Sequence, residues 1–231
     1  MTTRHSRTVV RRRARGAIAV FLGVLVLAGC RKTGTPSERA GDPALVRLDT
    51  EHMTLRHDLV GHDRWQSRAT FVLVDAYNEG TEDLLTTLRA TFVAADGAAL
   101  GKSDRQSLRI PAGGVRTFAL IDAARQDRPD ATTAKVEVTG ALVPSYPPPV
   151  QVTDGHIYRD GDRVVANAMI RNAVDRPVTV IVLAAFYDQD DRLLTRPFTT
   201  LYLPEAGNHP AQFVGPSGSV KGYVFIGDMK F

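Results

Sequence analysis

The chain contains a single cysteine, Cys30, and the residues before it indicate what this thiol is for. One thiol can neither close a disulfide within the chain nor build a cysteine-based zinc site. Residues 1–29 carry six arginines and no acidic side chain, and residues 18–28 form an uncharged, mainly apolar run. A basic region, a short apolar region and small residues at the cleavage site are the parts of an export signal peptide. Because a spanning helix needs about 20 apolar residues, this run is too short to be a permanent anchor.

The four residues Leu27, Ala28, Gly29 and Cys30 resemble the lipobox of bacterial lipoprotein signal peptides, in which a branched apolar residue and two small residues precede the cysteine. The resemblance covers the first 30 residues. It implies that residues 1–29 are a cleaved signal peptide and that Cys30, as the new N-terminus, carries acyl chains such as palmitate. A single acyl chain binds a membrane only marginally, so the two or three chains of a lipoprotein are needed for a stable anchor.

Two alternatives to this interpretation stay open. Residues 1–29 also fit a plain export signal or a short anchor in which Cys30 is incidental, and the arginines at 11–13 also fit a twin-arginine signal. Arg31 follows the cysteine, where lipoproteins held in the inner membrane of Gram-negative bacteria carry an aspartate. We therefore expect a lipid-anchored protein of the bacterial cell envelope, on the outer membrane facing the periplasm if the envelope is Gram-negative.

The net charge of the chain depends on the predicted signal peptide. The whole sequence has 29 basic and 25 acidic side chains. Without the six signal arginines, 23 basic residues face 25 acidic residues, a formal charge of about −2. The mature chain therefore lacks the basic excess of a nucleic-acid-binding protein, and we expect no nucleic-acid partner.

Two polar or proline-rich segments divide the rest of the chain. Residues 30–44 are rich in Gly, Pro and Ser and are typical of a flexible tether. Residues 144–150 contain three consecutive prolines, which cannot donate to a sheet and favour a stiff spacer. We therefore predict two domains, residues 45–143 and residues 151–231, each large enough for one small core.

The two predicted domains repeat one pattern at a constant offset of 94 residues. No gap is needed between residues 74–100 and 168–194, and the matching pairs are Asn78 with Asn172, Leu84 with Val178, Leu88 with Val182, Ala90 with Ala184, Phe92 with Phe186 and Asp96 with Asp190. Taken alone, residues 83–95 also fit a helix, since their leucines lie at helical spacing. The matching residues 178–187 are rich in β-branched and aromatic side chains, so the repeat predicts a strand followed by a turn in both copies.

Further short strands are expected at roughly ten-residue spacing, with turn residues between them. They cover residues 69–76, 106–110, 116–121, 135–138, 163–170 and 221–226. No long helix is expected after residue 30. The pattern predicts an all-β fold of two small β-sandwich domains.

The second copy resembles the FxLYD-type immunoglobulin-like domain of bacterial envelope proteins, and Phe186, Tyr187 and Asp188 carry the match. The first copy departs from the Tyr-Asp part of that motif and is closer to the small YcfL-like lipoproteins. These resemblances imply tandem immunoglobulin-like β-sandwich domains on a lipid anchor. Neither family brings an active site, and a fold by itself does not indicate an activity.

Three histidines are the best candidates for metal ligands. His52, His57 and His62 lie five residues apart, with Asp58 and Asp63 beside the last two. A spacing of five converges side chains neither on a helix face nor on a strand face, and a zinc site also needs a fourth ligand and supporting hydrogen bonds. We therefore predict an exposed polar strand and loop here and no metal site.

Other polar residues have a simpler explanation as turn chemistry. Asp188, Asp190 and Asp191 bear the oxygen ligands that calcium prefers, but they sit at a predicted hairpin turn. Ser217 lies in a Gly-Pro-Ser-Gly turn and not in the Gly-x-Ser-x-Gly motif of hydrolases. We predict no catalytic residue, no enzymatic activity and no cofactor.

The expected function is therefore that of a non-catalytic envelope lipoprotein with a structural or protein-interaction role, in contact with the membrane through Cys30 and with another envelope protein through sheet edges and loop tips. Trp65 and Tyr146 lie in polar or proline-rich surroundings and are either docking residues or contacts between spacer and domain. The alternative function is an accessory subunit of an envelope complex that binds a ligand or metal.

The anchor prediction is tested by the substitution Cys30→Ser, which removes the sulfur that would be acylated. The variant should leave the membrane fraction, and its mass should lack the lipid. The matched control Ser37→Ala, within the tether, should stay with the membrane. Retention of Cys30→Ser in the membrane fraction would contradict the prediction.

Overall fold

The computed structural model describes residues 38–60 and 66–230. The predicted signal peptide, the lipobox residues Leu27 to Gly29 and the lipidation residue Cys30 lie outside this part of the chain, as do His62, Asp63 and Trp65. The described residues belong to one compact unit. No helix in this part of the chain is long and apolar enough to cross a membrane.

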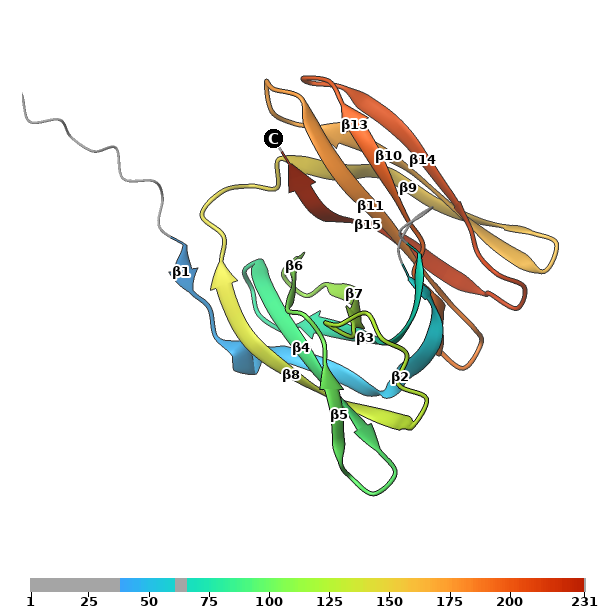
Figure 1. The fold of residues 1–231 in the computed structure, drawn as a ribbon. Coiled ribbons are helices and arrows are strands. Elements are labelled where there is room, and N and C mark those ends of the chain that lie inside the picture. The colour runs from blue at the N-terminus through green and yellow to red at the C-terminus, as the bar shows by residue number, and fades with distance from the viewer. Residues whose placement is uncertain (1–37, 61–65, 231) are drawn as a thin grey trace, which may run out of the picture. The chain divides into compact units, whose positions relative to one another are not determined.

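The fold is nearly all β, as the sequence predicts (Figure 1). One short 3-10 helix, η1, spans Pro43–Leu45. The strands are β1 (Arg39–Ala40), β2 (Val46–Val60), β3 (Ser67–Asn78), β4 (Leu84–Ala94), β5 (Ala99–Lys102), β6 (Gln106–Ile110), β7 (Val115–Ile121), β8 (Ala131–Val143), β9 (Val150–Asp160), β10 (Arg163–Asn172), β11 (Val178–Tyr187), β12 (Leu193–Thr195), β13 (Phe198–Leu203), β14 (Asn208–Val214) and β15 (Lys221–Lys230). All strand pairs among the described residues are antiparallel. The strands predicted from the repeat and from the turn signals are present.

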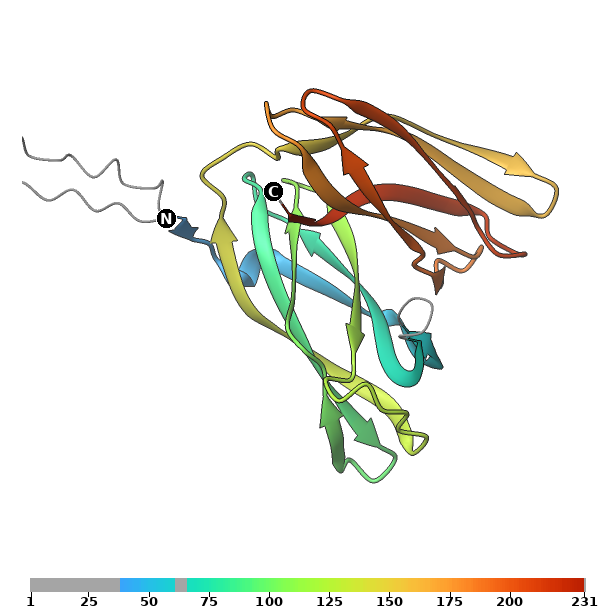
Figure 2. The same ribbon diagram turned by 45° about the horizontal axis from the view of Figure 1, so that its top comes forward.

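The strands form four sheets, and the second half of the chain repeats the order of the first. In the N-terminal half, β2, β3 and β7 form one sheet, and β4 pairs with β5, β6 and β8 in the other. In the C-terminal half, β9, β10 and β14 form one sheet, and β11 pairs with β12, β13 and β15 in the other. The two views of the ribbon show the same succession of hairpins in both halves (Figures 1 and 2).

A buried asparagine occupies the same place in each half. Asn78 ends β3, Asn172 ends β10, and each is 1% exposed. In both, the side-chain amide donates to the carbonyl oxygen four residues later and to another 32 residues later. In both, the side-chain oxygen accepts from the backbone N–H two residues later. Each asparagine therefore ties the turn after its strand to a distant turn of the same half.

Strand β11 is buried on both faces. Its even-numbered residues, among them Val182 and Phe186, belong to a core formed within the C-terminal half. Its odd-numbered residues Leu183, Ala185 and Tyr187 belong to the core that contains the strands of the N-terminal half. Alternate side chains of a strand point to opposite faces, so β11 contributes to both cores at once. This explains why residues 178–187 form a nearly continuous apolar run and not an alternating one.

The fold begins within the segment that the sequence assigns to the flexible tether. Arg39 and Ala40 of β1 pair with Val143 and Leu142 of β8. Asp42 caps η1 through its Oδ1, which accepts from the backbone N–H of Ala44 at 2.9 Å. Residues 39–44 are therefore structured, upstream of the expected boundary at residue 45, because strand pairing and a cap satisfy their backbone groups.

The buried asparagines predict a matched pair of stability effects. Asn78→Ala leaves buried carbonyl and N–H groups without a partner, so it should lower the free energy of unfolding by about 2–3 kcal/mol in denaturant titrations. Asn172→Ala should lower the free energy of unfolding by a similar amount. The exposed Asn208→Ala should stay within about 0.5 kcal/mol of the native protein. A loss that small for both buried positions would show that these networks do not hold the turns.

Candidate functional site

The histidines that were considered as candidate metal ligands do not form a metal site among the described residues. His52 and His57 both lie on β2, while His62 lies outside the described residues. His52 Nδ1 is 3.0 Å from Asp49, and His57 Nδ1 is 2.8 Å from Asp127 Oδ1. Among residues 38–60 and 66–230, no three His, Cys, Asp or Glu side chains are placed to share a metal ion. His52 and His57 are instead each oriented by a carboxylate of their own.

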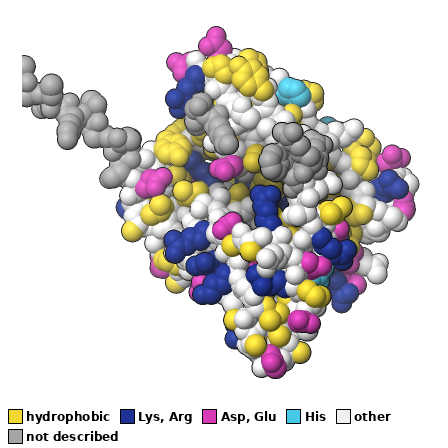
Figure 3. Space-filling model, viewed as in Figure 1, with side chains coloured by type: hydrophobic (Ala, Val, Ile, Leu, Met, Phe, Trp, Pro, Cys, Tyr) yellow, Lys and Arg dark blue, Asp and Glu magenta, His cyan; other side chains and the backbone are white. Residues whose placement is uncertain are grey.

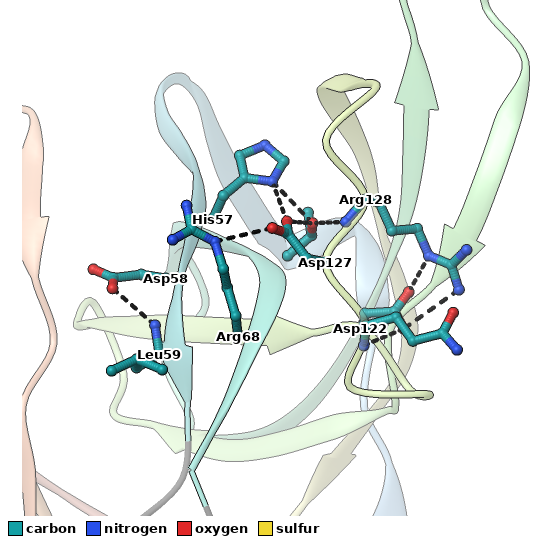
Figure 4. A network of polar contacts seen from close by, with 9 residues as sticks. His57, Asp58, Leu59, Arg68, Asp122, Asp127 and Arg128 are labelled. Carbon is teal, nitrogen blue, oxygen red and sulfur yellow. Dashed lines mark hydrogen bonds and ion pairs between the residues drawn. The ribbon is translucent and has the colours of Figure 1, made fainter.

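The His57–Asp127 pair is part of a polar network between β2, β3 and the segment that follows β7 (Figure 4). Asp127 Oδ2 also accepts from Arg68 Nε at 2.9 Å. The bond to His57, supported by Arg68, holds the pKa of Asp127 below its usual value. Thr70 Oγ1 accepts from the backbone N–H of Arg128 at 2.7 Å. The network fastens this segment to the sheet.

A second ion pair holds the same segment. Arg128 Nε donates to Asp122 Oδ2 at 2.7 Å, and Asp122 is 1% exposed (Figure 4). Asp58, beside His57 in the sequence, accepts from the backbone N–H of Leu59 and lies 3.7 Å from Arg56. The carboxylates of Asp122 and Asp58 are therefore engaged by arginines or by backbone N–H groups of the protein itself.

The β11–β12 turn is held by hydrogen bonds between an aspartate side chain and the backbone of the turn. Asp188 Oδ1 accepts from the N–H groups of Asp190 and Arg192, both at 2.9 Å. Asp191 has φ of 61° and forms an ion pair with Lys221. This is an Asx-type turn, in which a side chain replaces a backbone acceptor.

Two remaining candidates from the sequence lie in turns or loops. Ser217 donates a hydrogen bond to Asp162, which connects two turns of the C-terminal half. Tyr146 is 51% exposed, and its carbonyl oxygen accepts from Arg109 Nη1 at 2.7 Å. The backbone of the proline-rich segment is thus held by an arginine of β6, while the ring of Tyr146 faces solvent.

A buried polar cluster joins the two halves, and the sequence analysis missed it. Asp75 on β3 is 9% exposed and accepts from Thr117 Oγ1 at 2.5 Å and from the Tyr187 hydroxyl at 2.8 Å. The hydroxyl of Tyr223 on β15 lies 2.8 Å from Thr117 Oγ1. The rings of Tyr187 and Tyr223 stack with centroids 6.1 Å apart. Side chains of β3, β7, β11 and β15 therefore meet at one carboxylate.

Burial shifts the acidities in this cluster. It raises the pKa of Asp75 above its usual value, although the two hydroxyl donors act in the opposite sense. Burial also raises the pKa of Tyr223 to about 12 and that of Tyr187 further. Both tyrosines therefore stay neutral donors at physiological pH, and the two hydroxyl hydrogen bonds only partly offset the desolvation cost of the carboxylate.

The cluster borders a pocket of about 220 Å³. Tyr77, Lys221 and the His52–Asp49 pair also line it. The arrangement can hold a small polar molecule. A sequence signal did exist: Asp75 is the single charged residue within the apolar run of residues 69–78.

On the face shown in Figure 3, basic and acidic side chains are interspersed, and the basic side chains do not form the continuous patch that is typical of a nucleic-acid-binding surface. Hydrophobic side chains on that face form only small groups. This agrees with the nearly neutral composition of the chain after residue 30.

Comparison with known proteins does not identify a family. No protein-family model matches the chain, and no curated protein matches it. Red sea bream transglutaminase is similar at 15% identity with a TM-score of 0.24, and the match covers 74% of this chain and 30% of the transglutaminase. The CBM22-1–CBM22-2 tandem domain of Xyn10C from Paenibacillus barcinonensis is similar at 8% identity with a TM-score of 0.14, over 84% of this chain and 91% of the other. These scores are too low to carry an argument about fold or function.

The buried carboxylate predicts a pH-dependent stability difference. Because the pKa of Asp75 is raised in the folded state, its protonated form favours folding below the usual pKa of 3.8. That contribution is lost as pH rises from 3.8 through the folded pKa. Asp75→Asn removes the ionisation, so its stability relative to the native protein should increase between about pH 4 and pH 7 in denaturant titrations. A flat difference for Asp75→Asn would contradict the expectation.

Proposed function

We propose that this protein is a non-catalytic lipoprotein of the bacterial cell envelope, tethered by lipid on Cys30, that binds another envelope protein through its β-modules. The lipobox resemblance supports the tether, and Arg31 favours the outer membrane, facing the periplasm, in a Gram-negative envelope. The structural partners found for the described histidines and for Asp127 and Asp188 support a non-catalytic role.

The modules are proposed to be immunoglobulin-like. If the two-residue strand β1 is set aside, and β5 with β6 and β12 with β13 each count as one interrupted strand, each half has six strands. The first, second and fifth then form one sheet, and the third, fourth and sixth form the other. This alternation between two packed antiparallel sheets is the arrangement of immunoglobulin-type sandwiches, and it supports the resemblance of residues 178–188 to the FxLYD-type domain.

The observation that carries the interaction role is the exposed outer end of β9. Within the described part of the chain, β9 pairs with β10 alone, so its other edge is unpaired. Ile157 is 48% exposed and Tyr158 is 44% exposed on this edge strand. Tyr158 and Val214, which is 54% exposed, both lie beside Val165 of β10. Unpaired backbone groups next to exposed apolar side chains favour docking of an extended strand from a partner.

The alternative of an accessory ligand- or metal-binding subunit has one specific observation in its favour. His52 and His57 do not support the metal version, because each pairs with a different carboxylate. The ligand version is supported by a groove lined by Arg196, a partly buried arginine with two sealed guanidinium nitrogens that lack a hydrogen-bond partner among the described residues.

The proposed interaction surface is tested by site-specific photocrosslinking in intact cells. A photoreactive phenylalanine analogue at Tyr158 should capture a discrete envelope protein, because the side chain faces the proposed partner. The same analogue at Ala98, in the exposed turn between β4 and β5, is the matched control and should capture none. Equal yields at the two positions would contradict a docking role for β9.

A further inference from the structure

A groove of about 550 Å³ lies between strands of the two halves. Residues 104–108 and β7 line one side, and β11, β15 and the β12–β13 segment line the other. Its apolar lining includes Ile181 and Leu183 of β11 and Phe198 at the start of β13. Pockets of this volume accommodate small organic molecules, which bind apolar walls and a few fixed polar groups.

Arg196 is the unusual polar residue of this groove. Its side chain lines the groove, and its Nε and Nη1 are sealed from solvent without a hydrogen-bond partner among residues 38–60 and 66–230. Burial lowers the pKa of Arg196 to about 10, so the guanidinium is still charged at neutral pH. A buried charge without a counter-ion destabilises a fold, so its presence calls for a compensating group.

The other largely buried arginine at the junction is better satisfied. Arg116 Nη1 donates to the carbonyl oxygen of Val115 at 2.8 Å. Its guanidinium also lies 5.4 Å from the ring centroid of Phe225, within the range of a cation–π contact. Within the described part of the chain, its Nε is buried without a partner, whereas Arg196 has two such nitrogens and no contact that offsets its charge. The need for a compensating anion is therefore greatest at Arg196 and in the groove that it lines.

The chain itself limits the charge of a suitable ligand. Arg105 and Arg125, both exposed, add positive charge to the lining. Asp104 and Asp228, also exposed, add negative charge. The lining therefore suits a molecule with one anionic group directed at Arg196, and it disfavours a polyanion.

We propose that this groove binds a small amphipathic organic anion, whose carboxylate or phosphate pairs with Arg196 and whose apolar body packs on Ile181, Leu183 and Phe198. Because Nε and Nη1 are sealed inside the protein, the head group would accept from Nη2. Carboxylate and phosphate oxygens both accept such a charge-assisted hydrogen bond. This binding activity is independent of the lipid anchor and of the β9 edge.

Calorimetric titration of the full-length protein tests the proposal with octanoate, octyl phosphate and uncharged 1-octanol as probes. Octanoate or octyl phosphate should bind with a stoichiometry of one, and 1-octanol should bind at least tenfold more weakly. Binding of only one of the two anions identifies the head group. Equal affinity for the alcohol and both anions, or no binding of either anion, would overturn the proposal.

Substitution of the arginine separates binding from folding. Arg196→Met removes the charge but keeps an unbranched, largely apolar side chain, and it should weaken binding of the anion at least tenfold, whereas the exposed control Arg171→Met should leave it unchanged. Without ligand, Arg196→Met should unfold at the same temperature as the native protein or a higher one, because it removes an unpaired buried charge. Unchanged anion affinity in Arg196→Met would overturn the assignment of this residue.

Discussion

The burial of β11 on both of its faces is the constraint on which the described structure depends. Val182 and Phe186 pack within the C-terminal half, while Leu183 and Tyr187 pack against strands of the N-terminal half. Complete burial of one large apolar side chain stabilises a fold by about 1.5–3 kcal/mol, so each face contributes several such increments. Neither half can expose its side of β11 without losing that contribution. The shared strand therefore makes the folding of the two halves interdependent.

Polar groups at the junction work against stability and in favour of a defined arrangement. The Asp75 carboxylate is desolvated, yet two hydroxyls direct hydrogen bonds to it from β7 and β11. Another packing of the two halves would leave this carboxylate buried and unpaired, which is more costly than the present one. Arg196 lacks such compensation at two of its nitrogens, and the groove beside it gives room for an external anion. At the junction, the buried carboxylate of Asp75 therefore has hydrogen-bond partners, whereas two nitrogens of the Arg196 guanidinium have none among the described residues.

Much of the strand arrangement could be predicted, because short-range sequence patterns determine where the strands and turns lie. The repeat at an offset of 94 residues placed β4 and β11 as strands, and the paired asparagines at 78 and 172 mark equivalent turns in the structure. Part of β2 was expected as an exposed polar strand around its histidines, but its full extent, Val46–Val60, was not predicted. Its pairing with β3 and the packing of Leu48, Met53 and Leu55 against the core depend on residues distant in the sequence. The site residues were harder to find. Asp75 and Arg196 belong to residue types that are normally exposed, and only the contact between distant strands buries them.

The interdependence of the two halves is tested most directly by differential scanning calorimetry of the full-length protein. The account predicts one unfolding transition, with a calorimetric enthalpy equal to the van't Hoff enthalpy, because β11 cannot leave one core without disturbing the other. Two resolved transitions, each with the enthalpy of one half, would show that the halves fold separately and that the shared strand does not join them.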